Sequence, residues 1–232
     1  MNVVITGASQ GIGYAVAELF AKEGYTLLLC SKTPENIQKA SASLQAKYPQ
    51  ARIHFMPANL SNKEGCVDFA NWCLVLGTPS ILINNAGHFS PGNIADEEEG
   101  NLEAQLATNL FSAYHTTRAL LPKMLLAKTG HIFNICSIAS LQAYAQGGAY
   151  SISKFALLGF SKNLRLELQN KGIKVTAVCP GATYTNSWAG SGIEESRIME
   201  SADIAKMIFA AAHLSSQAVV EDIVMRPQLG DV

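Results

Sequence analysis

Short apolar runs alternate with longer stretches of helical periodicity along the whole chain. The apolar runs are rich in Val, Ile and Leu and mostly continuous, which is typical of strands that are covered on both faces. This pattern predicts strands at residues 2–6, 25–30, 52–56, 80–84, 131–136, 173–179 and 218–225. Helical periodicity predicts helices at residues 12–23, 34–48, 62–76, 96–127, 148–169 and 201–214. The regular alternation indicates a parallel sheet with helices on both faces.

The predicted helices have start and stop signals of their own. We expect Ser61 and Asp96 to be N-caps, and Gly24 and Gly172 to follow helix ends. Pro122 is expected to kink the long fourth helix, because proline cannot donate the helical hydrogen bond.

No repeat, linker or low-complexity tract divides the chain. We therefore predict one α/β domain over residues 1–232, doubly wound, with a mostly parallel seven-stranded sheet. In such sheets ligands bind beyond the carboxyl ends of the strands. The stretch 186–200 follows the sixth strand, so we expect it to cover a ligand.

Composition narrows the class of protein. The chain has 17 Lys and Arg against 18 Asp and Glu, a net charge of −1. It has no basic run, so we expect no nucleic-acid partner. No apolar run reaches about 20 residues, so we expect no membrane span. The five cysteines and five histidines lack metal-ligand spacing, so we expect buried thiols in a reducing cytoplasm and no metal site.

A glycine-rich turn follows the first predicted strand, in the stretch TGASQGIG at 6–13. Gly7 permits a tight turn, Gly11 lets the backbone approach a pyrophosphate, and Gly13 lets the helix pack close to the strand. The helix that follows offers free N–H groups and the positive end of its dipole to phosphates. This context predicts a dinucleotide cofactor.

The end of the second strand bears on which nicotinamide cofactor fits. An acidic residue there would bind the ribose 2′-hydroxyl of NAD. The chain instead has Ser31 and Lys32, and the first carboxylate is Glu35. Lys32 can pair with a 2′-phosphate, and Ser9 and Ser31 can donate hydrogen bonds to it. The sequence therefore favours NADP(H), with NAD(H) kept as the alternative.

Tyr150 and Lys154 are four residues apart in a predicted helix, which places both side chains on one face. A free tyrosine has a pKa of about 10, too high for ready proton exchange at neutral pH. A nearby ammonium favours the phenolate and lowers that pKa, so the pair can serve as a general acid and base. Alone, this spacing is common by chance.

Six motifs occur together in a fixed order. They are the TGxxxGxG turn, Asn84-Asn85-Ala86-Gly87, Asn109, Ser137, the YxxxK pair at 150–154, and Pro180-Gly181. In this order and spacing the chain resembles the short-chain dehydrogenase/reductase family, of its shorter-chain type, from end to end. The resemblance implies a Rossmann-like fold and an oxidoreductase that transfers hydride with a nicotinamide cofactor.

The resemblance also implies a role for each catalytic candidate. Tyr150 would donate a proton to the carbonyl oxygen of a small-molecule substrate, and Ser137 would hydrogen-bond the same oxygen. Lys154 would lower the pKa of Tyr150 and hold the ribose hydroxyls. Asn109 would hold a water that relays protons to Lys154.

The cofactor would occupy the carboxyl edge of the sheet. The residues that the resemblance and the motifs assign to it are Gly7, Ser9, Gln10, Gly11, Ile12, Gly13, Ser31, Lys32, Asn59, Leu60, Asn85, Ala86, Gly87, Tyr150, Lys154, Pro180, Gly181, Thr183 and Thr185. Three positions depart from the family's commonest pattern. Asn59 stands where an aspartate usually contacts the adenine, Gln10 where many NADP-preferring members carry arginine, and Cys136 where a serine is frequent.

Several substrates and one non-enzymatic role remain open. Tyr144 and Trp188, with Ser137, are the candidates for the substrate pocket, since aromatic side chains supply apolar area with a polar tip. Residues 219–223 and 226–227 resemble bacterial sepiapterin-reductase-type members. Two alternatives to a general carbonyl reductase remain. A 3-ketoacyl-thioester reductase would need a basic patch at the mouth of the cleft, where the predicted covering stretch has only Arg197. A non-catalytic NADP(H)-sensing regulator would not need all four catalytic candidates. By the same resemblance we expect a homodimer or homotetramer through helices 96–127 and 148–169.

Overall fold

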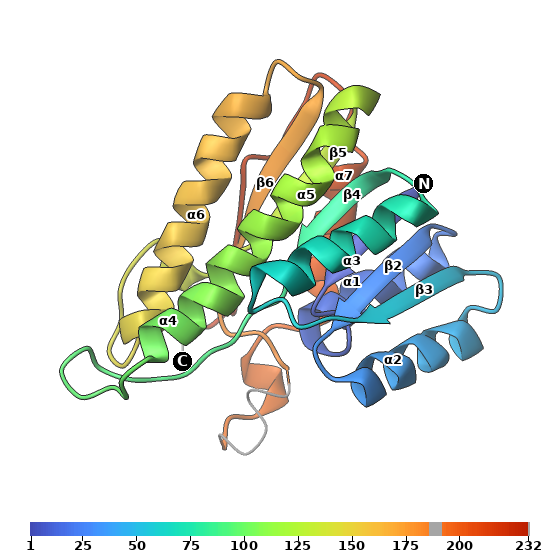
Figure 1. The fold of residues 1–232 in the computed structure, drawn as a ribbon. Coiled ribbons are helices and arrows are strands. Elements are labelled where there is room, and N and C mark those ends of the chain that lie inside the picture. The colour runs from blue at the N-terminus through green and yellow to red at the C-terminus, as the bar shows by residue number, and fades with distance from the viewer. Residues whose placement is uncertain (186–191, 232) are drawn as a thin grey trace.

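The parallel sheet begins with the first apolar run of the chain and builds outward from it in both directions. The structure is a computed structural model that describes residues 1–185 and 192–231. Its strands are β1 (Asn2–Thr6), β2 (Thr26–Ser31), β3 (Arg52–Pro57), β4 (Pro79–Asn84), β5 (Gly130–Ile135), β6 (Ile173–Pro180) and β7 (Asp222–Met225). In this part of the chain they form one sheet in the order β3-β2-β1-β4-β5-β6-β7 (Figure 1). The strand order reverses between β1 and β4, which is where such sheets bind ligands.

Helices cover both faces of this sheet. They are α1 (Gly11–Lys22), α2 (Pro34–Lys47), α3 (Lys63–Leu76), α4 (Asn101–Leu106), α5 (Ser112–Ala127), α6 (Gly148–Leu168) and α7 (Ser201–Ala212). One buried cluster joins α1, α2 and α7 to alternate strand residues such as Ile5. A second cluster joins α3, α5 and α6 to the intervening residues such as Val4. Figure 1 shows α3, α5 and α6 in front of the sheet. The fold is the Rossmann-like α/β arrangement that the sequence predicts.

All predicted strands except the last, and all predicted helices except 96–127, agree with the observed bounds to within one or two residues. Gly24 and Gly172 have φ angles of +79° and +75° just past the ends of α1 and α6, as expected of helix stops. All strand pairings are parallel, so the sheet is wholly rather than mostly parallel. All five cysteines are buried.

The predicted long helix at 96–127 is wrong in its first third. Residues 94–100 are turns and irregular backbone, and α4 begins only at Asn101. Gly100 precedes it with a φ of +85°, a left-handed conformation that suits glycine, so Asp96 is not its N-cap. The segment then departs from α-helical geometry in a π-helical turn, Ala107–Phe111. Pro122 lies inside α5, as the predicted position of that helix requires.

Two smaller predictions are also wrong. Asn62, and not Ser61, is the N-cap of α3, because its side-chain Oδ1 accepts the N–H of Gly65 at 2.8 Å. The last strand begins at Asp222, so residues 218–221 lie outside the sheet. In the described part of the chain, no helix is long and apolar enough to cross a bilayer.

His131 is a neutral histidine buried in the sheet at the start of β5. Its Nε2 lies 2.7 Å from Oγ1 of Thr176, and that hydroxyl donates its own proton to the carbonyl of Val220 at 2.6 Å. The imidazole therefore donates to Thr176. Burial, assisted by the positive charge of Lys174, lowers the pKa of His131 to about 3.

This buried histidine predicts sensitivity to acid. The unfolded chain binds a proton below pH ~6.5 that folded His131 does not, so stability is complete above that pH and falls as the pH drops toward 3. From pH 7 to pH 5 the contribution lost is about 2 kcal/mol. Urea unfolding at both pH values measures this loss. The His131→Gln variant should not show this loss of stability, whereas the His54→Gln variant, changed at an exposed histidine, should show it in full. An equal loss in His131→Gln would contradict the prediction.

Candidate active site

The glycine turn between β1 and α1 is held against the end of β4 by two polar side chains. Oγ1 of Thr6 accepts the N–H groups of Asn85 and Ala86, both at 2.9 Å. The side-chain amide of Asn85 donates to the carbonyls of Thr6 at 2.9 Å and Gly7 at 3.0 Å. The two strand ends at the topological switch point are therefore fixed to one another.

This turn leaves no space for side chains at its glycines. A Cβ at Gly13 would lie 2.4 Å from Nδ2 of Asn85 and 2.5 Å from the carbonyl oxygen of Gly7. Gly11 has a φ of +58°, and a Cβ there would lie 2.9 Å from Cγ2 of Thr185. The N-terminus of α1 thus presents bare backbone beside both β4 and the segment after β6. Bare N–H groups at a helix N-terminus suit a pyrophosphate, so the residues of this edge fit a dinucleotide.

The ends of β2 and β3 lie beside the same turn. The N–H of Ala8 donates to the carbonyl of Cys30, and the N–H of Ala58 donates to the carbonyl of Ser31, both at 2.9 Å. Lys32 is exposed immediately after β2. Ser9 lies in the turn, Gln10 is the N-cap residue of α1, and Ile12 lies in the first turn of that helix.

Asn59 and Leu60 are less available to a ligand than the sequence suggests. The side-chain oxygen of Asn59 accepts from the backbone N–H and the hydroxyl of Ser61, at 3.3 and 2.8 Å. The side chain of Leu60 is buried in the core with Cys66 and Phe69. A cofactor would therefore meet the Asn59 amide group and the Leu60 backbone.

Tyr150, Lys154, Ser137 and Asn109 come together at the ends of β4 and β5. Lys154 is buried and its Nζ donates to the carbonyl of Ile135, the last residue of β5, at 2.8 Å. The same Nζ lies 5.7 Å from the centre of the Tyr150 ring. A Cβ at Gly87 would lie 3.3 Å from Oδ1 of Asn109 and 3.6 Å from Nζ of Lys154.

Asn109 lies in the π-helical turn and joins the loop after β4 to α6. Its Oδ1 accepts the N–H of His88 at 2.7 Å, and its Nδ2 donates to the carbonyl of His88 at 2.9 Å and to Oγ of Ser153 at 2.8 Å. Ser153 in turn donates to the carbonyl of Tyr150 at 2.7 Å. Both amide protons of Asn109 are engaged, so a water relay would use its remaining lone pair or its backbone.

Ser137 follows β5 and begins a short helical turn, Ile138–Ser140. Its Oγ accepts the N–H of Ala139 at 3.1 Å, which fixes the hydroxyl near the end of the strand. Burial raises the pKa of Tyr150, and the hydrogen bond with Ser137 opposes that rise. Burial also lowers the pKa of Lys154. The sequence predicts a lowered tyrosine pKa, but loss of solvent outweighs the stabilisation of the phenolate here, so Tyr150 is protonated at neutral pH.

Two partly exposed aromatic side chains, Phe89 and Tyr144, lie near Tyr150. The Phe89 ring packs edge-on against the Tyr150 ring with centroids 4.9 Å apart, yet it is 44% exposed. Tyr144 is also 44% exposed, and burial, with the nearby charge of Tyr150, raises its pKa to about 12. Sequence reasoning missed Phe89, although an aromatic residue directly after a strand-end motif is a usable signal. Trp188 lies outside the described residues.

The segment after β6 completes the edge. Pro180 ends β6, and the N–H of Gly181 donates to the carbonyl of Met225 in β7 at 2.8 Å. Oγ1 of the buried Thr183 donates to the carbonyl of Gly181 at 2.9 Å. Thr185 then meets the glycine turn at Gly11. Of the predicted covering stretch 186–200, the structure describes 192–200, which contains a short helical turn, Glu195–Arg197.

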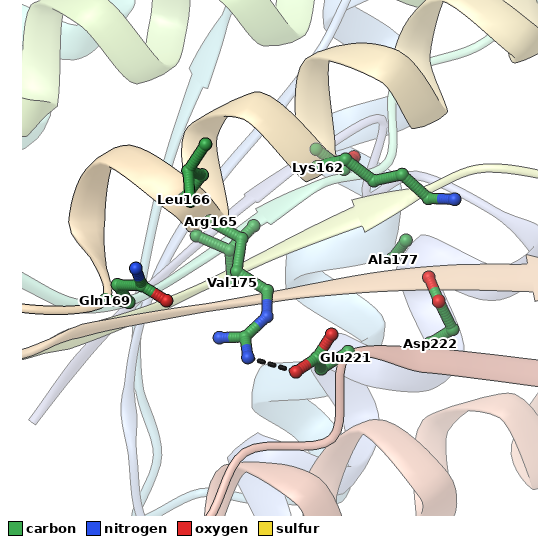
Figure 2. Close-up of a pocket in the computed structure, with 9 residues that line it drawn as sticks. Lys162, Arg165, Leu166, Gln169, Val175, Ala177, Glu221 and Asp222 are labelled. Carbon is green, nitrogen blue, oxygen red and sulfur yellow. Dashed lines mark hydrogen bonds and ion pairs between the residues drawn. The ribbon is translucent and has the colours of Figure 1, made fainter.

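A hollow on the surface lies away from the carboxyl edge of the sheet. It is a cavity of about 490 Å³ between α6, β6 and β7, where Arg165 pairs with Glu221 (Figure 2). Its strand residues are Val175 and Ala177 from the middle of β6 and Asp222 from the start of β7, and none of the residues lining it is a predicted site residue. In residues 1–185 and 192–231, no cluster of three or more His, Cys, Asp or Glu could hold a metal ion.

Comparison with known proteins gives consistent matches over the whole chain. A sequence model described as short chain dehydrogenase matches residues 1–195. The sepiapterin reductase of Chlorobaculum tepidum is 31% identical, over 99% of this chain and 97% of that protein. A metagenomic short-chain oxidoreductase solved in complex with NADP is 30% identical, with a TM-score of 0.83 over 98% of this chain and 97% of its own. The L-sorbose reductase of Gluconobacter frateurii, solved with NADPH and L-sorbose, is 25% identical, with a TM-score of 0.89 over 97% and 94% of the two chains.

The crowding around Gly13 predicts that Gly13→Ala lowers the free energy of unfolding. The added Cβ must displace the Asn85 amide or the Gly7 carbonyl, at a cost of about 1–3 kcal/mol. Gly159→Ala is the matched control, because it also lies in a helix and its Cβ would meet no atom within 4 Å. That control should gain up to about 1 kcal/mol from helix propensity. Urea unfolding compares them, and equal stability of the two variants would contradict the prediction.

Proposed function

Because the chain belongs to the short chain dehydrogenase family, we propose that it is an NADP(H)-dependent reductase of a small carbonyl compound, which it converts to an alcohol. The observation that carries this proposal is that a partly buried, protonated Tyr150 lies beside Ser137 and the buried Lys154 at the end of β5. A proton donor and a second hydroxyl at one point suit a carbonyl oxygen that gains negative charge.

The chain's own residues position the substrate and move the proton. A bound nicotinamide supplies the hydride. Tyr150 donates its hydroxyl proton to the carbonyl oxygen, and Ser137 hydrogen-bonds the same oxygen as its charge develops. Lys154, fixed by the carbonyl of Ile135, places a positive charge beneath the Tyr150 ring and stabilises the phenolate that remains. Asn109 holds the loop after β4 against α6.

Two features favour a small ketone with an apolar substituent. Phe89 packs against the Tyr150 ring and Tyr144 lies near it, and both aromatic side chains are partly exposed to solvent, where an apolar substituent could contact them. Arg197, the positive charge that a thioester carrier would require nearby, instead donates to the carbonyls of Gly230 and Asp231 at 3.0 and 3.1 Å. A 3-ketoacyl thioester therefore ranks lower. The similarity to a sepiapterin reductase makes a pterin side-chain ketone one compound to test.

The remaining expectations belong to the same proposal. One catalytic domain spans residues 1–232, and the stretch near 186–200 covers the substrate. The protein acts in the cytoplasm as a homodimer or homotetramer through α5 and α6. A hollow of about 480 Å³ between these helices, lined by apolar side chains such as Leu121 and Phe160, supports that pairing. A non-catalytic sensor would not require the arrangement around Tyr150.

The proton-donor role predicts that Tyr150→Phe loses carbonyl reduction by about 10²–10⁴-fold, the usual contribution of a general acid. The ring is retained, so NADPH binding should stay within about twofold, since the hydroxyl alone is removed. NADPH consumption with ketones, diketones, pterins and acetoacetyl thioesters measures the rate. Tyr48→Phe, at the C-cap of α2, is the control and should match the parent. Equal rates for Tyr150→Phe and the parent would refute the role.

The exposed Lys32 predicts the cofactor preference. Lys32→Ala should lower kcat/KM for NADPH by about tenfold and leave that for NADH unchanged, because only NADPH carries the 2′-phosphate. The control is Lys39→Ala at an exposed lysine on α2, and it should change kcat/KM for neither NADPH nor NADH. Steady-state kinetics with both cofactors measure the ratio. A parent enzyme that uses NADH and NADPH equally well would contradict the preference.

A further inference from the structure

The helix that carries Tyr150 has no N-terminal cap from its own sequence. Its N-cap residue is Gly147, and its first turn contains no acidic residue. The first N–H groups of a helix have no intrahelical partner and need one from elsewhere. Here the partner is distant in sequence, since Oε2 of Glu97 accepts the N–H of Ala149 at 3.3 Å.

The surroundings of Glu97 are shaped to hold this contact. The N–H of Gly92 donates to the carbonyl of Gln146 at 2.9 Å, and Oδ1 of Asn93 accepts the N–H of Gln146 at 3.3 Å. Residues 92–97, here called the capping segment, therefore lie along the start of α6. A Cβ at Gly148 would lie 2.6 Å from the carbonyl oxygen of Gly92 and 3.1 Å from Oε2 of Glu97. A side chain at Gly148 would therefore crowd the Glu97 carboxylate, and glycine at this position avoids the contact.

Glu97 also contacts α4, the helix that leads into the π-helical turn with the candidate catalytic residue Asn109. The same Oε2 accepts from Nδ2 of Asn101, the first residue of α4, at 2.8 Å. The Asn101 side chain then accepts from Gln105 at 3.3 Å, and the π-helical turn with Asn109 follows directly. One carboxylate thus joins the segment that leads to Asn109 and the helix turn that contains Tyr150.

We propose that Glu97 is a positioning residue for Tyr150. Its carboxylate satisfies the first turn of α6 and interacts favourably with the positive end of the helix dipole. Ala149 directly precedes Tyr150, so the capped turn sets where the Tyr150 hydroxyl lies relative to Ser137. The catalytic consequence rests on the proposed reductase function, whereas the contact itself does not.

The test compares Glu97→Ala, Glu97→Gln and Glu98→Ala in the full chain. Glu97→Ala should lower kcat by about 10–100-fold, since a misplacement of about 1 Å can have that effect. Its dissociation constant for NADPH should stay within about twofold, because the dinucleotide would bind mainly at the glycine turn. Glu97→Gln keeps an acceptor oxygen and should recover most of kcat. Glu98→Ala, at the exposed neighbour, should match the parent.

Amide hydrogen exchange provides a readout that needs no turnover. Glu97→Ala should speed exchange in residues 147–151, because the first turn of α6 loses the carboxylate that accepts the Ala149 N–H, and leave exchange at the start of α1 unchanged. If that variant does not fold, Glu97→Asp withdraws the carboxylate by one methylene and should show a smaller change of the same kind.

Two results would overturn the role of Glu97. One is parent-like exchange at residues 147–151 in the alanine variant. The other is a loss of kcat accompanied by an equal loss of NADPH affinity and stability, which would indicate general damage. A parent enzyme without turnover on any carbonyl would instead overturn the proposed function, and exchange at 147–151 would then decide the role of Glu97 alone.

Discussion

The carboxyl edge of the sheet is organised around one buried positive charge. Lys154 is only 5% exposed, and a primary ammonium removed from water is costly unless polar atoms replace the solvent. Its Nζ donates to the carbonyl of Ile135, so β5 must end where α6 passes. Gly87 lies close to both Nζ and the Asn109 amide, so the loop after β4 must come equally near. The end of β5, the loop after β4, α6 and the π-helical turn with Asn109 therefore meet around the Lys154 ammonium, where polar atoms replace solvent.

Much of this edge can be predicted from the sequence because its signals are local. The glycine turn must have glycines at 7, 11 and 13 wherever a strand, a turn and a helix meet so closely. Tyr150 and Lys154 share a helix face by periodicity alone. The last strand was harder to predict. Residues 218–221 continue an apolar run, but the carbonyl of Val220 is taken by the Thr176 hydroxyl, and the strand begins only at Asp222.

The parts that sequence reasoning missed depend on contacts between distant segments. The predicted helix 96–127 would place the acidic residues 96–99 in its first turn, where acidic side chains are favourable. Glu97 does lie at a helix N-terminus, but the helix is α6, where its carboxylate accepts the N–H of Ala149, 52 positions later in the chain. Phe89 was missed for the same reason, because its contact with Tyr150 exists only once the loop after β4 meets α6. The position of Phe89 after the strand-end motif indicates a residue near the site, but no pattern within either segment indicates which distant residue it contacts.

The burial that holds Lys154 also bears on the direction of the proposed reaction. Loss of solvent favours the neutral form of each group, so it raises the pKa of Tyr150 and lowers that of Lys154. Reduction requires the protonated phenol and slows as the pH rises through the tyrosine pKa, whereas oxidation of the alcohol requires the phenolate. A raised pKa therefore extends the reductive range toward higher pH and moves the oxidative range further above neutrality. The Ser137 hydroxyl opposes the rise, and the nearby Lys154 ammonium also favours the phenolate, so the balance between burial and these two groups sets the pH at which Tyr150 changes from acid to base.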